Sequence, residues 1–119
     1  MKKLTILLFI TLTLLIQGCG FFEETICENG HAVVKDGLIY LPDQQEPFTG
    51  NNLCRYKNGQ KKSEGKIKDG KREGKWTGWY ANGQKVEESN WKDGKLDGKW
   101  TRWHENGKIK RYWFFKDGK

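Results

Sequence analysis

The sequence predicts an all-β fold, an elongated single-layer antiparallel β-meander built from repeated hairpins. Two observations predict it. The segment Tyr56–Trp79 matches Tyr80–Trp103 at fifteen positions, and a third, partial copy starts at His104. Each copy also carries one Asn-Gly and one Asp-Gly pair, which are typical of type I′ hairpin turns because such turns need positive φ at both central residues. The turns are spaced alternately by about 11 and 13 residues, which leaves strands of about nine to eleven residues.

Two-residue turns also fix which side chains share a face of the sheet. Counting outward from the turns predicts four opposed pairs, Ile67 with Arg72, Trp91 with Leu96, His104 with Ile109, and Trp100 with Trp113. One face then gathers most of the large rings, and we call it the aromatic face. Its rings are Tyr56, Trp76, Tyr80, Trp91, Trp100 and Trp113, and Ile67, Leu96, Ile109 and Phe115 accompany them.

The other face, which we call the lysine face, gathers most of the lysines. The same count places Glu64 opposite Lys75, Lys66 opposite Glu73 and Glu88 opposite Lys99, and each such pair contributes roughly 0.2–1 kcal/mol. A bulge at one of the glycines would shift part of this register. Five apolar residues also fall on the lysine face and form the candidate binding patch, namely Trp79, Val86, Trp103, Tyr112 and Phe114.

A single open sheet has no second layer to bury its aromatic face. We expect the rings to serve packing, with the N-terminal part or a partner covering them; the alternative is an exposed ligand groove. The N-terminal part, residues 27–55, is expected to be an irregular β segment, with strands at 32–34 and 38–41 around Asp36-Gly37, a turn at 42–47 and the first meander strand at 51–56.

The first eighteen residues are expected to form the helix of a signal peptide. Met1-Lys2-Lys3 supplies positive charge, and the apolar run 4–16 is too short for a stable membrane span. Residues 19–26 then form a tether. Export leaves Cys27 and Cys54 in an oxidising space, where an even count favours one disulfide worth ~3 kcal/mol. It would pin the N-terminal segment against the aromatic face; the alternative is two free buried thiols.

The run Ile16-Gln17-Gly18-Cys19 resembles the lipobox of bacterial lipoproteins. The resemblance implies cleavage before Cys19 and a diacylglycerol on its thiol, with acyl chains such as palmitate. Two or more chains give stable membrane attachment, at ~0.8 kcal/mol per buried CH₂. Gly20, in place of Asp, implies an outer-membrane position facing the periplasm in a Gram-negative host. The alternative is a plain signal peptide with an unmodified Cys19.

Charge is unevenly distributed along the mature chain. Residues 19–55 hold two basic and six acidic side chains, a net charge of −4, whereas residues 56–119 hold eighteen basic and nine acidic side chains, a net charge of +9. An exported basic surface does not ordinarily meet nucleic acid. Its accessible partners are anionic lipid head groups, acidic glycans or an acidic protein.

No pattern in the sequence predicts catalysis, a metal site or a cofactor. Ser63 and Ser89 lack spaced His and acid partners, and Cys27 and Cys54 with scattered His31 and His104 lack metal-ligand spacing. The repeated aspartates are the first residues of turns, where they serve backbone geometry. We therefore expect a protein that is not an enzyme.

The unit Tyr-x-Asn-Gly-Gln followed by Lys-Asp-Gly-Lys-x-x-Gly-Lys-Trp-Thr resembles the bacterial MORN-repeat variant, and Glu46-Pro47-Phe48-Thr49-Gly50 resembles the opening of YwqK-like proteins, often labelled antitoxins. The resemblance spans about residues 37–119 and implies a MORN-like sheet without catalysis that contacts protein or membrane. The expected function is a membrane-anchored binding module for a protein or envelope component. The alternatives are toxin immunity and a structural envelope spacer, and the oligomeric state stays open.

Overall fold

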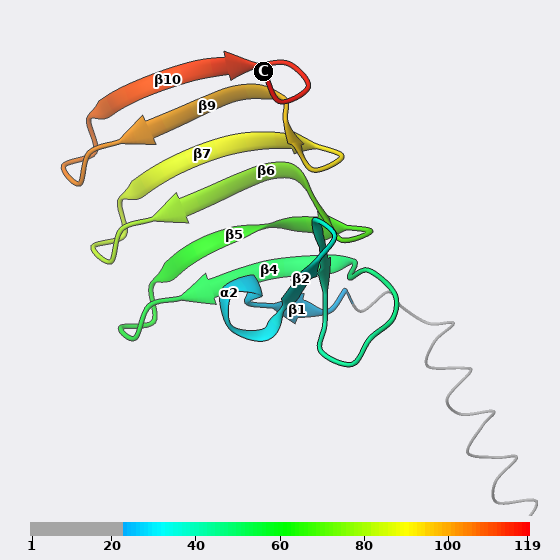
Figure 1. The fold of residues 1–119 in the computed structure, drawn as a ribbon. Helices are drawn as coiled ribbons and strands as arrows, with labels where there is room; N and C mark the ends of the chain where they lie inside the picture. Colours follow the sequence, from blue (N-terminus) through cyan, green and yellow to red (C-terminus); the bar gives the residue numbers. More distant parts are fainter. Residues whose placement is uncertain (1–22) are drawn as a thin grey trace, which may run out of the picture.

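The computed structural model describes residues 23–119, which fold as an all-β protein (Figure 1). The signal peptide expected at 1–18 and the acylation site Cys19 lie outside the described residues. Among residues 23–119, no helix has the length and apolar character needed to cross a membrane. The predicted antiparallel meander of hairpins is confirmed.

One eight-stranded sheet runs through the described part in the order β1-β4-β5-β6-β7-β9-β10, with β8 paired to β7 (Figure 1). All its pairs are antiparallel except β1 with β4. Its strands are β1 Thr25–Ile26, β4 Gly50–Arg55, β5 Lys61–Lys68, β6 Lys71–Trp79, β7 Lys85–Lys92, β8 Lys95–Leu96, β9 Gly98–Trp103 and β10 Ile109–Phe115. A separate hairpin joins β2 Val33–Lys35 to β3 Leu38–Tyr40, and α2 Glu28–His31 precedes it.

The two kinds of turn differ. At the Asp-Gly turns both central residues have positive φ, for example 50° at Asp69 and 80° at Gly70, as a type I′ turn requires. At the Asn-Gly turns only the glycine does, with φ 87° at Gly59. There the Tyr56 N–H donates to the Gln60 carbonyl (2.8 Å), which closes a three-residue loop. The prediction of two-residue turns was therefore right for Asp-Gly and wrong for Asn-Gly.

The longer loop moves the pairing beside it by one residue. Ile109 lies opposite Trp103 rather than the predicted His104. A β-bulge between Ile109 and Arg111 then restores the original count, so Trp100 does lie opposite Trp113 as predicted. Two one-residue irregularities thus cancel along each hairpin, and Ile109, at the place of Lys61 and Lys85 in the earlier copies, changes from the aromatic to the lysine face.

Register also shifts by two residues beyond Gly74, whose φ is +72°. Before the shift the predicted pairs are confirmed, namely Ile67 with Arg72, Lys66 with Glu73 and, in the next copy, Trp91 with Leu96. After it, Glu64 lies opposite Thr77 and Glu88 opposite Thr101, so the predicted pairs with Lys75 and Lys99 are wrong. Because side chains alternate with period two, an even shift leaves each residue on its predicted face.

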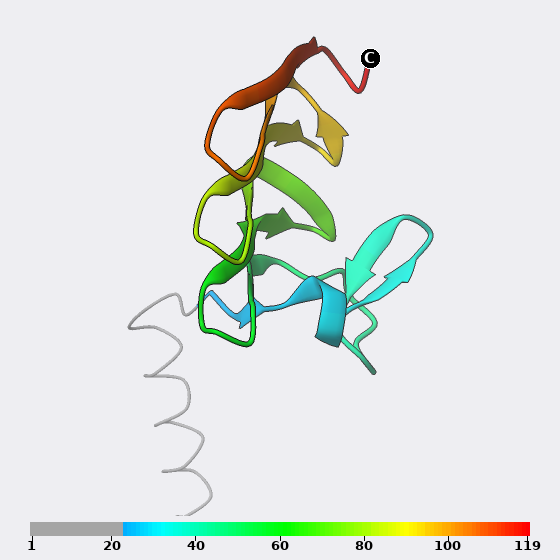
Figure 2. The ribbon, with the colours of Figure 1, turned by 90° about the vertical axis from the view of Figure 1, so that its left-hand side faces the viewer.

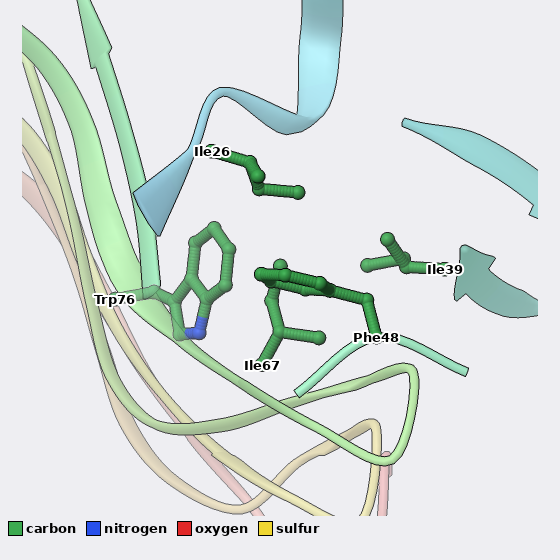
Figure 3. Close-up of a cluster of buried hydrophobic side chains, with 5 residues drawn as sticks. All are labelled: Ile26, Ile39, Phe48, Ile67 and Trp76. Atoms are coloured by element: carbon green, nitrogen blue, oxygen red, sulfur yellow. The ribbon is translucent and has the colours of Figure 1, made fainter. Parts of the chain in front are cut away.

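The N-terminal segment covers one end of the aromatic face. Figure 2 shows α2 and the β2–β3 hairpin on one side of the sheet, beside β4 and β5. A buried cluster joins the two layers (Figure 3) and consists of Ile26, Ile39, Phe48, Ile67 and Trp76. Cys27 and Cys54 form a disulfide with Cα atoms 4.7 Å apart, at the start of α2. The predicted pairing is present, and Thr25 and Ile26 of the expected tether form β1.

Candidate binding surface

The covered part of the aromatic face is a packed core. Trp76 is buried, and its Nε1–H donates to the Lys66 carbonyl (3.0 Å). The Arg72 guanidinium carbon lies 4.3 Å from the Trp76 ring and 5.2 Å from the Trp91 ring, and the same guanidinium forms an ion pair with Glu28 on α2. Arg72 therefore ties the N-terminal layer to two successive repeats.

Beyond the N-terminal cover the rings pack against one another. Trp100 and Trp113 stack with centroids 4.8 Å apart, and Phe115 lies 5.8 Å from Trp100. The Trp100 Nε1–H donates to the Glu87 carboxylate (3.0 Å). These rings are half-buried, so the aromatic face at this end is a ring-on-ring layer rather than an empty groove.

Tyr56 and Tyr80 lie at the Asn-Gly end of the sheet, where they tie one copy to the next. The Tyr56 hydroxyl donates to the Trp79 carbonyl (2.6 Å), and the Tyr80 hydroxyl donates to the Trp103 carbonyl (2.9 Å). The repetition of one bond in both copies indicates that these tyrosines fix the spacing between successive hairpins.

On the lysine face, lysine ammonium groups lie over aromatic rings, and we call this row of contacts the lysine-over-ring ladder. The contact of Lys61 with the Trp79 ring (5.7 Å) recurs one period later between Lys85 and Trp103 (5.6 Å). A different pair, Lys99 over Tyr112 (5.0 Å), continues the row between β9 and β10. Each ring keeps part of its surface accessible to solvent. A ring flanked by a cation offers both apolar area and positive charge to a ligand, which suits an acidic or amphipathic partner.

Glu88 lies on the same face, beside the lysines of this ladder. Its carboxylate forms ion pairs with Lys85 (2.8 Å) and Lys75 (3.5 Å). Partial burial alone would raise the pKa of Glu88, but hydrogen bonds and charge attraction from Lys85 and Lys75 outweigh burial and lower it from the usual 4.5. Glu88 therefore stays ionised and neutralises two lysines of the face.

The third copy departs from this arrangement along β10. Ile109, Tyr112 and Phe114 occupy the places that Lys85, Glu88 and Asn90 hold one period earlier. Their side chains are 59%, 56% and 71% exposed, and the rings of Tyr112 and Phe114 meet edge to face with centroids 5.9 Å apart. The lysine face therefore ends in an apolar surface at the last strand.

The five residues of the candidate binding patch do not form one continuous surface. Tyr112 and Phe114 touch each other, whereas Trp79 and Trp103 are half-buried side chains on β6 and β9. Val86 is the unpaired residue of the bulge between β6 and β7 and is half-buried. Ile109 was expected on the aromatic face and was left out of the patch, although the alignment of the third copy with the second places it in a lysine position.

Comparison with known families identifies the repeat. The family model described as MORN repeat variant matches residues 72–93 and 96–118. Each matched unit starts just after an Asp-Gly turn and contains one hairpin closed by an Asn-Gly loop, β6–β7 in the first and β9–β10 in the second. The part of the chain from residue 72 to residue 118 therefore matches two MORN repeat variants. No curated protein and no solved structure matches the chain.

Proposed function

We propose that this chain is an exported lipoprotein, anchored through Cys19, whose β sheet is a non-catalytic binding module for a protein or envelope component. The lysine-over-ring ladder is the observation that carries the binding role, because three such contacts line the lysine face at distances of 5.0–5.7 Å and two of them, Lys61 with Trp79 and Lys85 with Trp103, are equivalent in successive copies. MORN repeat variants at residues 72–93 and 96–118 are compatible with such a module.

Anchoring at Cys19 would orient the sheet. β1 begins at Thr25, six residues after Cys19, a stretch that spans at most about 20 Å. β10 is six strand spacings from β1 in the sheet order, about 29 Å at ~4.8 Å per spacing. A lipid at Cys19 therefore supports presentation of the β9–β10 end away from the membrane, toward partners in the surrounding space.

Anchoring is tested by substituting the acylated residue. The wild-type chain and Cys19→Ser are expressed in a bacterial host with an alkyne-bearing fatty acid, and membranes are separated from soluble material. We expect wild-type chain to carry the label and to sediment with membranes, and C19S to lose both properties. Label-free, soluble wild-type chain would contradict the proposal.

Binding is tested by capture from a detergent extract of the cell envelope. The variant Trp79→Ala/Trp103→Ala/Tyr112→Ala removes the rings, and Lys61→Gln/Lys85→Gln/Lys99→Gln removes the charges while it keeps the rings. Val33→Ala/Val34→Ala, on the exposed β2–β3 hairpin, is the matched control. Thermal melts confirm that each variant is folded.

We expect mass spectrometry to find a specific captured component with wild-type chain and with the valine control. The ring variant should lose at least about tenfold of the captured amount, since each lost aromatic contact is worth about 1 kcal/mol or more, and the lysine variant should lose less. Unchanged capture by both variants contradicts the proposed surface. Failure of wild-type chain to capture any specific component is the result expected of a structural spacer.

A further inference from the structure

β10 departs from the repeat at its outer edge in a way that reverses charge. Position 63 of β5 is Ser and lies opposite Gly78, and the equivalent residue of β7, Glu87, lies opposite Arg102. In both copies the opposed residues suit each other, because Ser63 and Gly78 are both small and Glu87 and Arg102 carry opposite charges. One period later the residue is Arg111 on β10, and it lies opposite Arg102 on β9, whose other neighbour is Glu87 on β7. The match is therefore broken at Arg111, and an acid on the open side of β10 would restore it.

A further strand of the β9 type does not suit this edge. Arg111 already lies opposite Arg102 on β9, and such a strand would bring a counterpart of Arg102 against its other side. A third arginine in the row adds a second like-charge contact, and like charges directly opposite destabilise a pair. The same reasoning argues against a second copy of β10. The segment Lys108–Lys116 contains four basic and no acidic residues, so two such edges would repel each other along their whole length.

The exposed apolar residues of β10 nonetheless favour binding of a further strand at this edge. Tyr112 and Phe114 replace polar Glu88 and Asn90, and they are among the most exposed large apolar side chains of the described residues. Within residues 23–119, β10 pairs with one strand, β9, and Arg111 belongs to no ion pair. The Arg111 guanidinium lies 5.2 Å from the Trp113 ring, on the opposite face from Tyr112.

We infer that β10 is a strand-addition site for an extended segment of a partner protein, antiparallel to β10, with an acidic residue opposite Arg111 and apolar residues beside it. Main-chain hydrogen bonds to the edge supply affinity, and the acid supplies selectivity. This inference deepens the proposed function, since it names the class of partner that the end of the lysine face takes.

The structure itself supplies the probe peptides. Segment 98–103 on β9, Gly-Lys-Trp-Thr-Arg-Trp, forms the strand that a repeat normally places next. The acidic probe is this peptide with glutamate in place of its arginine, Gly-Lys-Trp-Thr-Glu-Trp, and the unchanged peptide is the matched control. Both are capped at their ends, and binding to the folded chain is followed by amide chemical shifts of β10.

We expect the acidic probe to bind about threefold to tenfold more tightly than its control, because an attractive pair replaces a repulsive one. Arg111→Glu should reverse that preference, and restoring the repeat with Tyr112→Glu/Phe114→Asn should weaken both peptides. Equal binding of the two peptides to wild-type chain, or an unchanged preference in R111E, overturns the inference.

Strand addition is distinguished from plain charge attraction by backbone methylation. The acidic probe is N-methylated either at its odd or at its even amides, which leaves its charge and side chains unchanged. An edge-paired peptide directs one set of amides to β10, so one version should bind and the other should not. Equal binding of both versions overturns strand addition. The peptide preference and its reversal in R111E involve none of Trp79, Trp103 and Tyr112, so the capture test of the lysine face can fail or succeed separately.

The competing possibility is that the β10 edges of two copies of this chain pair with each other. Analytical ultracentrifugation of the chain at rising concentration measures this self-association. We expect a monomer, because the basic residues of two β10 strands repel each other. A dimer that is lost on Tyr112→Glu/Phe114→Asn substitution would overturn the inference in favour of a second copy as occupant.

Discussion

The Trp76 indole lies directly over the backbone of Gly65. A Cβ added at Gly65 would stand 2.2 Å from Cδ2 of Trp76, far inside van der Waals contact. The two-residue register shift near Gly74 lies on the strand pair that brings these residues together, between β5 and β6. The glycine of one strand thus makes the space in which the tryptophan of the next is buried.

Gly65→Ala should destabilise the fold by about 1–3 kcal/mol, since the methyl group forces Trp76 off its position in the core. For a domain of this size that lowers Tm by about 4–8 °C per kcal/mol, measured by calorimetry. Gly78→Ala is the matched control, because its added Cβ would meet atoms no closer than 3.5 Å. A melting temperature for G65A equal to that of G78A would contradict this packing.

Loss of the disulfide should cost about 2–4 kcal/mol of unfolding free energy, because the bond restricts the unfolded chain and holds α2 against the sheet. The variant Cys27→Ser/Cys54→Ser is compared with wild-type chain in urea unfolding. Adding a thiol reductant should lower wild-type stability to that of the variant and leave the variant unchanged. If the reductant leaves the urea unfolding midpoint of wild-type chain unchanged, the disulfide is absent or does not stabilise the fold.

The period and the turn dipeptides predicted most of the sheet, since each hairpin is a local structure. The Asn-Gly loops escaped prediction because the Asn58 side chain accepts a hydrogen bond from the Gln60 N–H (2.9 Å), which favours a three-residue loop over a type I′ turn. The shift near Gly74 could not be counted from turns at all, since it accompanies the burial of Trp76 against Gly65, a contact between strands.

Apart from Ile109, the predicted faces were right, because the shift near Gly74 is even. Trp79, Trp103, Tyr112 and Phe114 therefore keep their predicted side. Helix α2 gave no periodic signal over its four residues; the neighbouring disulfide and a bond from the Glu28 N–H to Asn52 Oδ1 (2.9 Å) hold it in place.

Tyr80→Phe should destabilise the fold by about 0.5–1.5 kcal/mol, because it removes the hydroxyl bond to the Trp103 carbonyl while it keeps the ring. Tyr56→Phe, at the equivalent place one copy earlier, should cost a similar amount. Tyr40→Phe is the control, as the Tyr40 hydroxyl makes no hydrogen bond within residues 23–119. Equal stability of Y80F, Y56F and Y40F in urea unfolding would refute the proposed tie between copies.

Stability should fall in acid as Glu88 is protonated. The pKa of Glu88 is lowered in the folded chain from 4.5, so its ionised form favours folding. This contribution is fully present above the unfolded value and is lost as pH falls from about 4.5 through the folded pKa. Carbon-detected NMR titration of the Glu88 carboxyl measures the shift, and urea unfolding across the same range measures its effect on stability.

Lys85→Met separates the cause of this shift from burial. Removing that ammonium, 2.8 Å from the carboxylate, should raise the pKa of Glu88 and shrink the loss of stability in acid, since the remaining ion pair with Lys75 is longer at 3.5 Å. Lys95→Met, on β8 and outside every ion pair of residues 23–119, should leave the titration where it is in wild-type chain. If K85M and K95M titrate alike, Lys85 does not lower the pKa of Glu88, and the attraction of Lys75 must by itself outweigh burial.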